Sequence, residues 1–353
     1  MSDAFQFRPR AEVDRGAWDR LVAASGDAWF WHLPGMMDLF AAWPPYDELS
    51  FGVLDGRGTL IAAVPLYLTG RRIASVVSHR YMESIGGPAC AAGLSASQRK
   101  KLLAAIREQL ASLLEEHDSE RVEINLSALA PALRGPDAPR VNPLLEAGFE
   151  DAQIGTWVVD LAPAPEAIRA AYLDGTRYEL RRTAREPYTL REAAGSRDIE
   201  TYYALHCETN ARAGRPPNPF DYFRVIFERF VPAGLARIVF FERHGRVIAA
   251  QMTALCKGGA YYWAGPSASE KGGGENRVLC DEQIMQARTR GCVLYETGDA
   301  AFNSADPKQQ GISDYKRSFG GKLVPHYAGR LSSPRLKFRV MRAARELFQP
   351  ALR

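Results

Sequence analysis

The chain has 353 residues, more than a typical single domain, which favours two domains. Hydrophobic residues make up 46% of it, enough for full cores, so long disordered stretches are not expected. Its 45 basic residues exceed its 41 acidic ones by four, a smaller excess than a general nucleic-acid-binding protein usually carries.

Several further classes of protein are excluded by simple patterns. No apolar run reaches the roughly 18 residues of a membrane-spanning helix, and residues 1–8 lack the features of a signal peptide. The five cysteines are odd in number, widely spaced and free of CxxC pairs, which argues against a zinc site or a disulfide framework. We therefore expect a cytoplasmic protein without a metal site.

The first half of the chain alternates helices with extended segments. Asp55-Gly56-Arg57-Gly58 lies between two strand-like runs and indicates a hairpin. Leu102, Ile106 and Leu110 recur at helical spacing and predict an amphipathic helix over 97–117. The other predicted helices cover 13–24, 34–43 and 144–149, and the predicted strands cover 4–8, 49–54, 60–68, 74–85, 122–126 and 156–161.

The second half repeats this order of elements without repeating the sequence. Its predicted helices cover 166–185 (with a weak point at Gly175), 199–213, 222–230, 276–290, 308–319 and 334–348. Its predicted strands cover 189–192, 236–242, 247–255, 260–264, 293–296 and 323–327. We expect an α/β protein of two domains, 1–162 and 163–329, each a twisted mixed sheet flanked by helices, followed by a basic helix over 330–353.

The stretch 311–321 places a lysine among aromatic residues and glycines. Lys316 follows Tyr315, and Phe319, Gly320 and Gly321 come next. Such a segment offers a cation beside backbone that a ligand can approach closely, because glycine has no Cβ. The plainer interpretation is a helix that ends in a glycine cap, with an exposed lysine.

The segment Tyr315-Lys316-Arg317-Ser318-Phe319-Gly320-Gly321 resembles the Phe/Tyr-Lys-x-x-Phe-Gly-Gly segment of the FemAB-type, double-GNAT transferases. GNAT denotes the Gcn5-related N-acyltransferases. An arginine-rich helix (residues 177–185), a proline-containing loop (215–219) and an acidic strand end (294–299) agree with it. The resemblance extends over about 165–327, and is closest to the polysaccharide-associated bacterial branch. It implies two tandem GNAT-like domains.

Enzymes of this family take an aminoacyl group from aminoacyl-tRNA and attach it to an amine, usually on a cell-envelope precursor. Relatives on the same scaffold are acetyltransferases. The resemblance implies that Lys316 lies at the reaction centre with Tyr315, where it stabilises an oxyanion or binds a donor phosphate. Glu296 and Asp299 end a strand and can accept a proton from the attacking ammonium, although solvated loop carboxylates are commoner. We expect Phe319, Gly320 and His326 to line the cleft.

A second stretch, Lys271-Gly272-Gly273-Gly274-Glu275-Asn276-Arg277, follows a strand and opens a helix, where free N–H groups can bind phosphate. It loosely resembles the loop by which GNAT acetyltransferases hold the pyrophosphate of coenzyme A. Asn276 departs from the small residue expected there, so the loop suits coenzyme A, a tRNA end or water alike. Arg177 and Arg181 share one helix face and suit phosphate, while a solvated helix face is the alternative.

The sequence contains no Ser-His-Asp order or HExxH motif, so direct attack by the amine is the simpler mechanism. The predicted function is transfer of an acyl or aminoacyl group from acyl-CoA or charged tRNA to an amine of a small molecule, sugar or envelope precursor. No permanently bound cofactor and no DNA partner are expected. The basic C-terminal helix leaves a peripheral contact with the inner membrane open. The alternative function is non-catalytic binding of an anionic glycan or lipid on the same scaffold.

Overall fold

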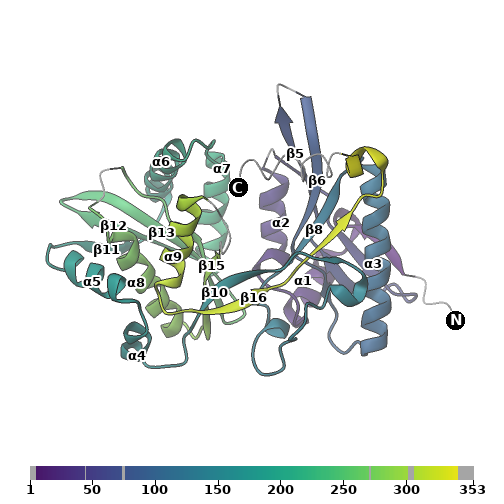
Figure 1. Cartoon of the computed structure of the whole chain (residues 1–353), viewed down its shortest axis with the longest axis horizontal. Coiled ribbons are helices and arrows are strands. Elements are labelled where there is room, and N and C mark those ends of the chain that lie inside the picture. The colour runs from purple at the N-terminus through teal and green to yellow at the C-terminus, as the bar shows by residue number, and fades with distance from the viewer. Residues whose placement is uncertain (1–4, 44, 74–75, 270–271, 301–305, 341–353) are drawn as a thin grey trace. The chain divides into compact units, whose positions relative to one another are not determined.

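The computed structural model describes residues 5–43, 45–73, 76–269, 272–300 and 306–340 (Figure 1). The chain divides into two compact units, Met1–Ile154 with Pro325–Arg353, and Gly155–Val324. These boundaries differ from those predicted: residues 155–162 are counted with the second unit and residues 325–329 with the first. The predicted basic helix is described only up to residue 340, and residues 336–340 of it are helical.

In the first unit, helices α1 (Arg15–Ala24), α2 (Pro34–Ala41) and α3 (Ala96–Glu116) pack against two sheets. The long helix α3 begins with a capping box in which Ser95 and Gln98 each accept a hydrogen bond from the other's backbone. The strands are β1 (Gln6–Pro9), β2 (Tyr46–Glu48), β3 (Phe51–Leu54), β4 (Leu60–Val64), β5 (Tyr67–Ile73), β6 (Val76–Gly86), β7 (Ala89–Cys90), β8 (Arg121–Leu126), β9 (Glu150–Asp151) and β17 (Ala328–Ser332).

These strands form a four-stranded sheet, β1-β3-β4-β7, and a six-stranded sheet, β2-β5-β6-β8-β17-β9. In the larger sheet β6 and β8 are parallel, and α3 is the crossover between them. Strand β17 comes from the end of the chain and pairs antiparallel with both β8 and β9. The first unit is therefore completed by residues that follow the whole second unit in sequence.

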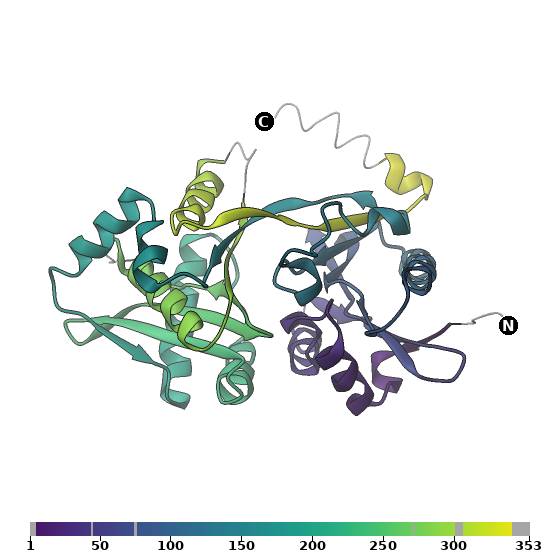
Figure 2. The same ribbon diagram turned by 90° about the horizontal axis from the view of Figure 1, so that it is seen from below.

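The second unit is built on one seven-stranded sheet in the order β11-β12-β13-β14-β15-β10-β16. In Figures 1 and 2 the yellow β16 runs beside the teal β10. The strands of this sheet are β10 (Ile154–Asp160), β11 (Thr189–Glu192), β12 (Ala236–Arg243), β13 (Arg246–Cys256), β14 (Gly259–Ala264), β15 (Leu294–Ala300) and β16 (Lys322–His326). Its helices are α4 (Pro165–Ala170), α5 (Asp174–Thr183), α6 (Ser196–Arg212), α7 (Phe220–Val225, continued by a π-helical turn to Phe230), α8 (Glu275–Thr289) and α9 (Pro307–Arg317).

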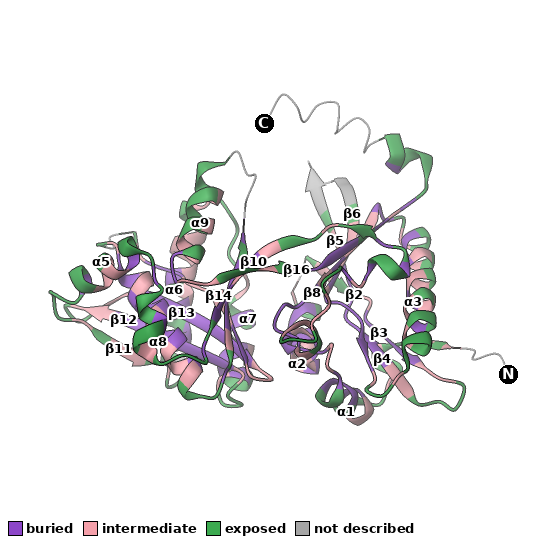
Figure 3. Cartoon of the chain, turned by 60° about the horizontal axis from the view of Figure 1, so that its bottom comes forward, coloured by how far each residue is buried: buried purple, intermediate pink, exposed green. Residues whose placement is uncertain are grey.

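The helix predicted over 166–185 is in fact two helices, α4 and α5, and the break does not fall at Gly175. It falls at residues 171–173, where Tyr172 is buried and Leu173 is extended. The Leu173 N–H donates to the carbonyl of Ser318 at 3.0 Å instead of continuing the helix. A tertiary hydrogen bond and a buried ring therefore override the local helical pattern. In Figure 3 much of α5 is green, that is exposed, whereas β13 is largely buried.

The parallel pair of strands β14 and β15 opens partway along its length. Strands β14 and β15 pair only through Gly259–Tyr261 and Leu294–Glu296. Beyond these residues β14 continues to pair with β13, and β15 with β10. The inner edges of the two strands therefore separate, and backbone groups there can bind a ligand. In both units a helix crosses between two parallel strands, so the predicted α/β fold with a repeated mixed sheet is confirmed.

Candidate functional site

Lys316 lies on α9 and reaches the strand where the sheet opens. The helix is started by Asp306, whose side chain accepts a hydrogen bond from the Lys308 N–H, and by Pro307 at its first position. Near its other end, Lys316 Nζ donates to the backbone carbonyl of Asp299 at 2.9 Å. A Cβ on Gly298 would lie 2.9 Å from the same nitrogen, and Gly298 has φ +108°. Glycine at 298 therefore leaves the space that the ammonium occupies.

The electrostatic setting of Lys316 combines burial with nearby carboxylates. Burial lowers the pKa of Lys316, and the negative charges of Asp299 and Glu296 oppose this without cancelling it. Glu296 is buried and accepts a hydrogen bond from Thr156 Oγ1 at 2.8 Å, whereas Asp299 is exposed. Three of the four residues predicted as catalytic, Lys316, Glu296 and Asp299, thus lie together at the end of β15.

This arrangement suits an amine substrate and a carbonyl that becomes negatively charged. An ammonium has three N–H donors, and the Asp299 carbonyl is the one hydrogen-bond partner of Lys316 Nζ within the described ranges. Two donors remain for a ligand oxygen. Burial raises the pKa of the neighbouring Tyr261 on β14, and Glu296 and Asp299 add to this effect. Tyr261 therefore stays a neutral hydroxyl at the mouth of the opening.

Tyr315, the fourth of these residues, faces helix α8 instead. Its hydroxyl donates to the carbonyl of Asn276 at 2.9 Å, and the Arg277 guanidinium lies over its ring at 5.6 Å from the centroid. Arg277 Nε also donates to Thr176 Oγ1 at 3.3 Å. Asn276 and Arg277, predicted to bind phosphate, thus contact Tyr315, and Arg277 also reaches α5, so the three residues join α5, α8 and α9.

The glycines after Phe319 serve close packing. The Phe319 ring is fully buried and lies edge-on to Tyr172 and Tyr315, with centroids 5.5 and 5.3 Å away. Gly320 has φ +72°, and a Cβ there would lie 2.5 Å from the carbonyl oxygen of Ala171. The structure thus places Phe319, predicted to line the cleft, in the interior of the unit, and it packs the half-buried Gly320 against Ala171. His326 ends β16, in the stretch counted with the first unit.

The predicted glycine-rich phosphate loop is described only from Gly272 onward, and Lys271 lies outside the described residues. The Gly272 N–H donates to the Glu275 carboxylate at 3.0 Å, and Glu275 is buried. A Cβ on Gly274 would lie 2.2 Å from Thr183 Oγ1, and Gly273 faces Arg182. The end of α5 therefore packs against the loop, and a phosphate bound at Gly272 would have to displace a carboxylate.

The two arginines predicted to bind phosphate lie apart from Lys316, on α5. Arg177 donates to the carbonyl of Ala170 and pairs with Asp174. Arg181 is exposed and lines a pocket. Sequence reasoning missed two residues of this site. Thr156 donates a hydrogen bond to Glu296, and Gly298 leaves space for the Lys316 ammonium. The only signal for Gly298 was its place between the two acidic residues of the strand end, and Thr156 had none, because its strand is 140 residues away.

Comparison with known proteins agrees with this geometry. Residues 170–317 match the family model described as an acetyltransferase (GNAT) domain. Residues 170–317 are therefore similar to a GNAT domain. The match covers the opened strand pair and Lys316, and it confirms the predicted resemblance to the GNAT superfamily. The curated proteins contain no match to this chain.

Solved structures extend the likeness to the whole chain. The crystal structure of FemX matches with a TM-score of 0.68 and 12% identity, over 95% of this chain and 99% of that one. A tandem GNAT protein from the clavulanic acid biosynthesis pathway matches with a TM-score of 0.54 and 16% identity, over 93% and 98%. The L-PGS of Bacillus licheniformis matches with a TM-score of 0.54 and 12% identity, over 95% and 96%. At these identities the likeness establishes the fold, a tandem GNAT arrangement. No helix within the described ranges is long and apolar enough to cross a membrane.

Proposed function

We propose that this protein is an N-acyltransferase that moves an acyl or aminoacyl group from a carrier to an amine by direct attack. The observation that carries the proposal is the placement of Lys316 Nζ, half-buried against the Asp299 carbonyl with two N–H donors to spare, where β14 and β15 separate. The match of residues 170–317 to the GNAT family model supports the transferase class.

The roles of the residues follow from the chemistry of acyl transfer. Attack of an amine on the acyl carbonyl produces a tetrahedral intermediate with a negative oxygen, which gains most from a preorganised cation or donor. Lys316 supplies that donor. Asp299 is exposed beside it and accepts the proton that the attacking ammonium loses, while the buried Glu296, held by Thr156, maintains the negative field that keeps Lys316 charged.

The donor is acyl-CoA or aminoacyl-tRNA, and the acceptor is an amine on a small molecule, sugar or cell-envelope precursor. The fold shared with FemX and L-PGS supports this class of substrates. We propose a cytoplasmic location, with a peripheral contact at the inner membrane where the acceptor is a lipid-linked precursor. No permanently bound cofactor is part of the proposal.

Replacement of Lys316 tests the proposal directly. We expect Lys316→Ala to lower turnover by about a hundredfold or more, the usual effect of removing one oxyanion donor. Lys308→Ala removes the same charge from an exposed position on the same helix and should leave turnover unchanged. Acetyl-CoA and charged tRNA are supplied in parallel with a panel of amines, and the melting temperature checks that each variant is folded.

Equal turnover in Lys316→Ala and wild type would rule out the assigned role of this residue. Absence of turnover with every donor would favour the alternative, a protein that binds an anionic glycan or lipid on a duplicated GNAT scaffold. The exposed arginines of α5 are the observation behind that alternative, and binding of an anionic glycan or of anionic vesicles tests it.

A further inference from the structure

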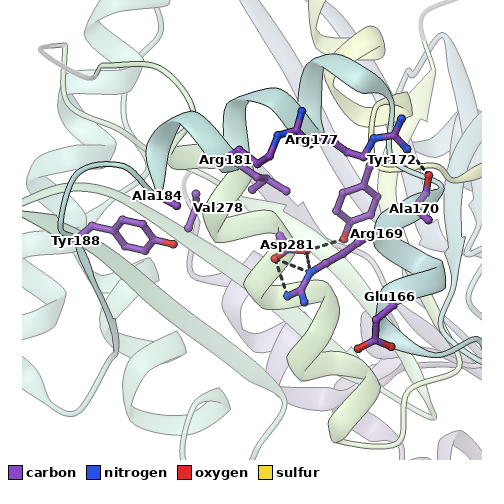
Figure 4. Close-up of a pocket in the computed structure, with 11 residues that line it drawn as sticks. Glu166, Arg169, Ala170, Tyr172, Arg177, Arg181, Ala184, Tyr188, Val278 and Asp281 are labelled. Atoms are coloured by element: carbon purple, nitrogen blue, oxygen red, sulfur yellow. Dashed lines mark hydrogen bonds and ion pairs between the residues drawn. The ribbon is translucent and has the colours of Figure 1, made fainter.

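A pocket of about 440 Å³ lies among helices α4, α5 and α8 of the second unit (Figure 4). Its size falls within the usual range for sites that hold small molecules. Apolar side chains, two tyrosines and three arginines surround it. The lining residues are Glu166, Arg169, Ala170, Tyr172, Arg177, Leu180, Arg181, Ala184, Tyr188, Val278 and Asp281.

Most charges around the pocket are already paired. Arg169 makes two parallel hydrogen bonds to Asp281, at 2.9 Å each, and the Tyr172 hydroxyl donates to the same carboxylate at 3.0 Å. Arg177 is held by Ala170 and Asp174. Arg181 differs, because it is exposed and no partner for its guanidinium occurs in the part of the chain that the structure describes. A planar, permanently charged group at the rim is thus available to an anion.

The walls of the pocket suit a flat organic group. Leu180, Ala184 and Val278 supply apolar surface. The ring of Tyr188 extends toward Val278 and Asp281 in Figure 4, and it is fixed from behind by stacking on Phe241, with centroids 4.8 Å apart and planes 21° apart. A fixed aromatic ring near an arginine is a combination that binds a base and its phosphate.

The pocket is separated from Lys316 by a row of aromatic rings. Tyr172 lines the pocket and touches Phe319, Phe319 touches Tyr315, and Lys316 follows Tyr315 on the side of β15. A group in the pocket therefore does not react at Lys316.

We propose that this pocket binds a nucleoside phosphate unit of the acyl carrier, with the phosphate on Arg181 and the base against Tyr188, Leu180 and Val278. The identity of the ligand as a carrier rests on the proposed function. Coenzyme A and the 3′ end of tRNA both contain adenosine joined to phosphate, so the same pocket residues can bind either carrier. In this proposal the pocket, and not the glycine-rich loop, binds the phosphate of the carrier. In the loop the Gly272 N–H already donates to the Glu275 carboxylate.

Calorimetric titration of the full-length protein tests the inference. The ligands are AMP, coenzyme A, an oligoribonucleotide ending in adenosine, and inorganic phosphate. We expect AMP and one of the two larger ligands to bind wild type, and Arg181→Ala to weaken both about tenfold, the effect of losing one charge-assisted hydrogen bond. Arg197→Ala removes an exposed arginine of α6 outside the pocket and should bind as wild type does. The larger ligand that competes with AMP identifies the source.

Three results would overturn the inference: no nucleotide binds wild type, Arg181→Ala binds as wild type does, or Arg197→Ala weakens binding as much as Arg181→Ala. Failure of the proposed function is distinguished by an acyl-pantetheine thioester, which carries the reactive group without a nucleotide. Suppose that no nucleotide binds, but that wild type transfers the acyl group from this thioester and Lys316→Ala does not. The proposed transferase function is then supported, and only the inference about the nucleotide pocket is wrong.

Discussion

The position of the Lys316 side chain depends on Gly298, the residue of β15 beside its ammonium group. The side chain fits because position 298 has no Cβ and because the backbone there adopts a positive φ that glycine tolerates. The neighbouring Thr297 is the extra residue of a bulge opposite Trp157 and Val158, and its hydroxyl donates to the carbonyl of Lys316 at 3.1 Å. Strand β15 thus fixes both the backbone and the side chain of this lysine.

We expect Gly298→Ala to impair turnover while the protein stays folded. The new Cβ would lie 2.9 Å from Lys316 Nζ and force the ammonium away, and the strained φ of +108° should cost about 1 kcal/mol or more of stability. Steady-state kinetics and thermal melts measure the two effects. Gly311→Ala is the control, because nothing lies within 4 Å of its Cβ and the residue is within α9. Turnover by Gly298→Ala equal to that of Gly311→Ala would contradict the placement of Lys316.

At the scale of elements, the imidazole of His206 connects helix α6 to the proline-containing loop of residues 215–219. His206 Nε2 accepts a hydrogen bond from the Asn218 N–H at 3.0 Å, and its ring packs on Phe223 with centroids 4.6 Å apart. An accepting nitrogen must be unprotonated. Burial lowers the pKa of His206 below its usual 6.5, in agreement with this role.

The hydrogen bond from the Asn218 N–H to His206 predicts that the stability of the protein depends on pH. The folded state disfavours the charged imidazole, so the contribution of His206 is present above about pH 6.5 and is lost as the pH falls through its lowered pKa. We expect the melting temperature of wild type to fall more steeply between about pH 7 and pH 5 than that of His206→Gln, which keeps an acceptor but does not titrate. Parallel slopes for the two proteins would show that His206 does not carry the effect.

The same scale shows where sequence patterns were reliable. The amphipathic spacing of Leu102, Ile106 and Leu110 predicted α3 closely, because a long apolar stripe needs little tertiary context. The segment 166–185 was predicted as one helix, because the contacts of residues 171–173 with Ser318 and the core are remote in sequence. The short edge strands β2, β7 and β9 carry too few residues for a periodic signal.

At the scale of the whole molecule, the chain returns to its first unit after completing the second. Strand β17 inserts between β8 and β9, where Ala328 and Leu331 are buried, and the Leu126 N–H donates to the carbonyl of Tyr327 at 2.8 Å. The first unit therefore cannot complete its six-stranded sheet from residues 1–154 alone.

A variant that ends at Val324 should lose stability in the first unit. It lacks β17, so the facing edges of β8 and β9 are unpaired and the apolar area under Leu331 is exposed. We expect the lower unfolding midpoint in calorimetry to fall by about 10 °C or more. A variant that ends at Val340 keeps β17 and should melt as the full chain does. Equal melting of the two variants would contradict a structural role for β17.

The sequence by itself determined the α/β class, the repeated order of elements and the GNAT resemblance, because these depend on local periodicity and on one seven-residue motif. It also predicted a catalytic group of Lys316, Tyr315, Glu296 and Asp299, the first two from the resemblance and the two acidic residues from their place at a strand end. Only the tertiary structure decided which motif residues serve packing, as Phe319 and Gly320 do, and that a carboxylate covers the glycine-rich loop. These outcomes depend on contacts between segments far apart in the chain, and no local pattern encodes them.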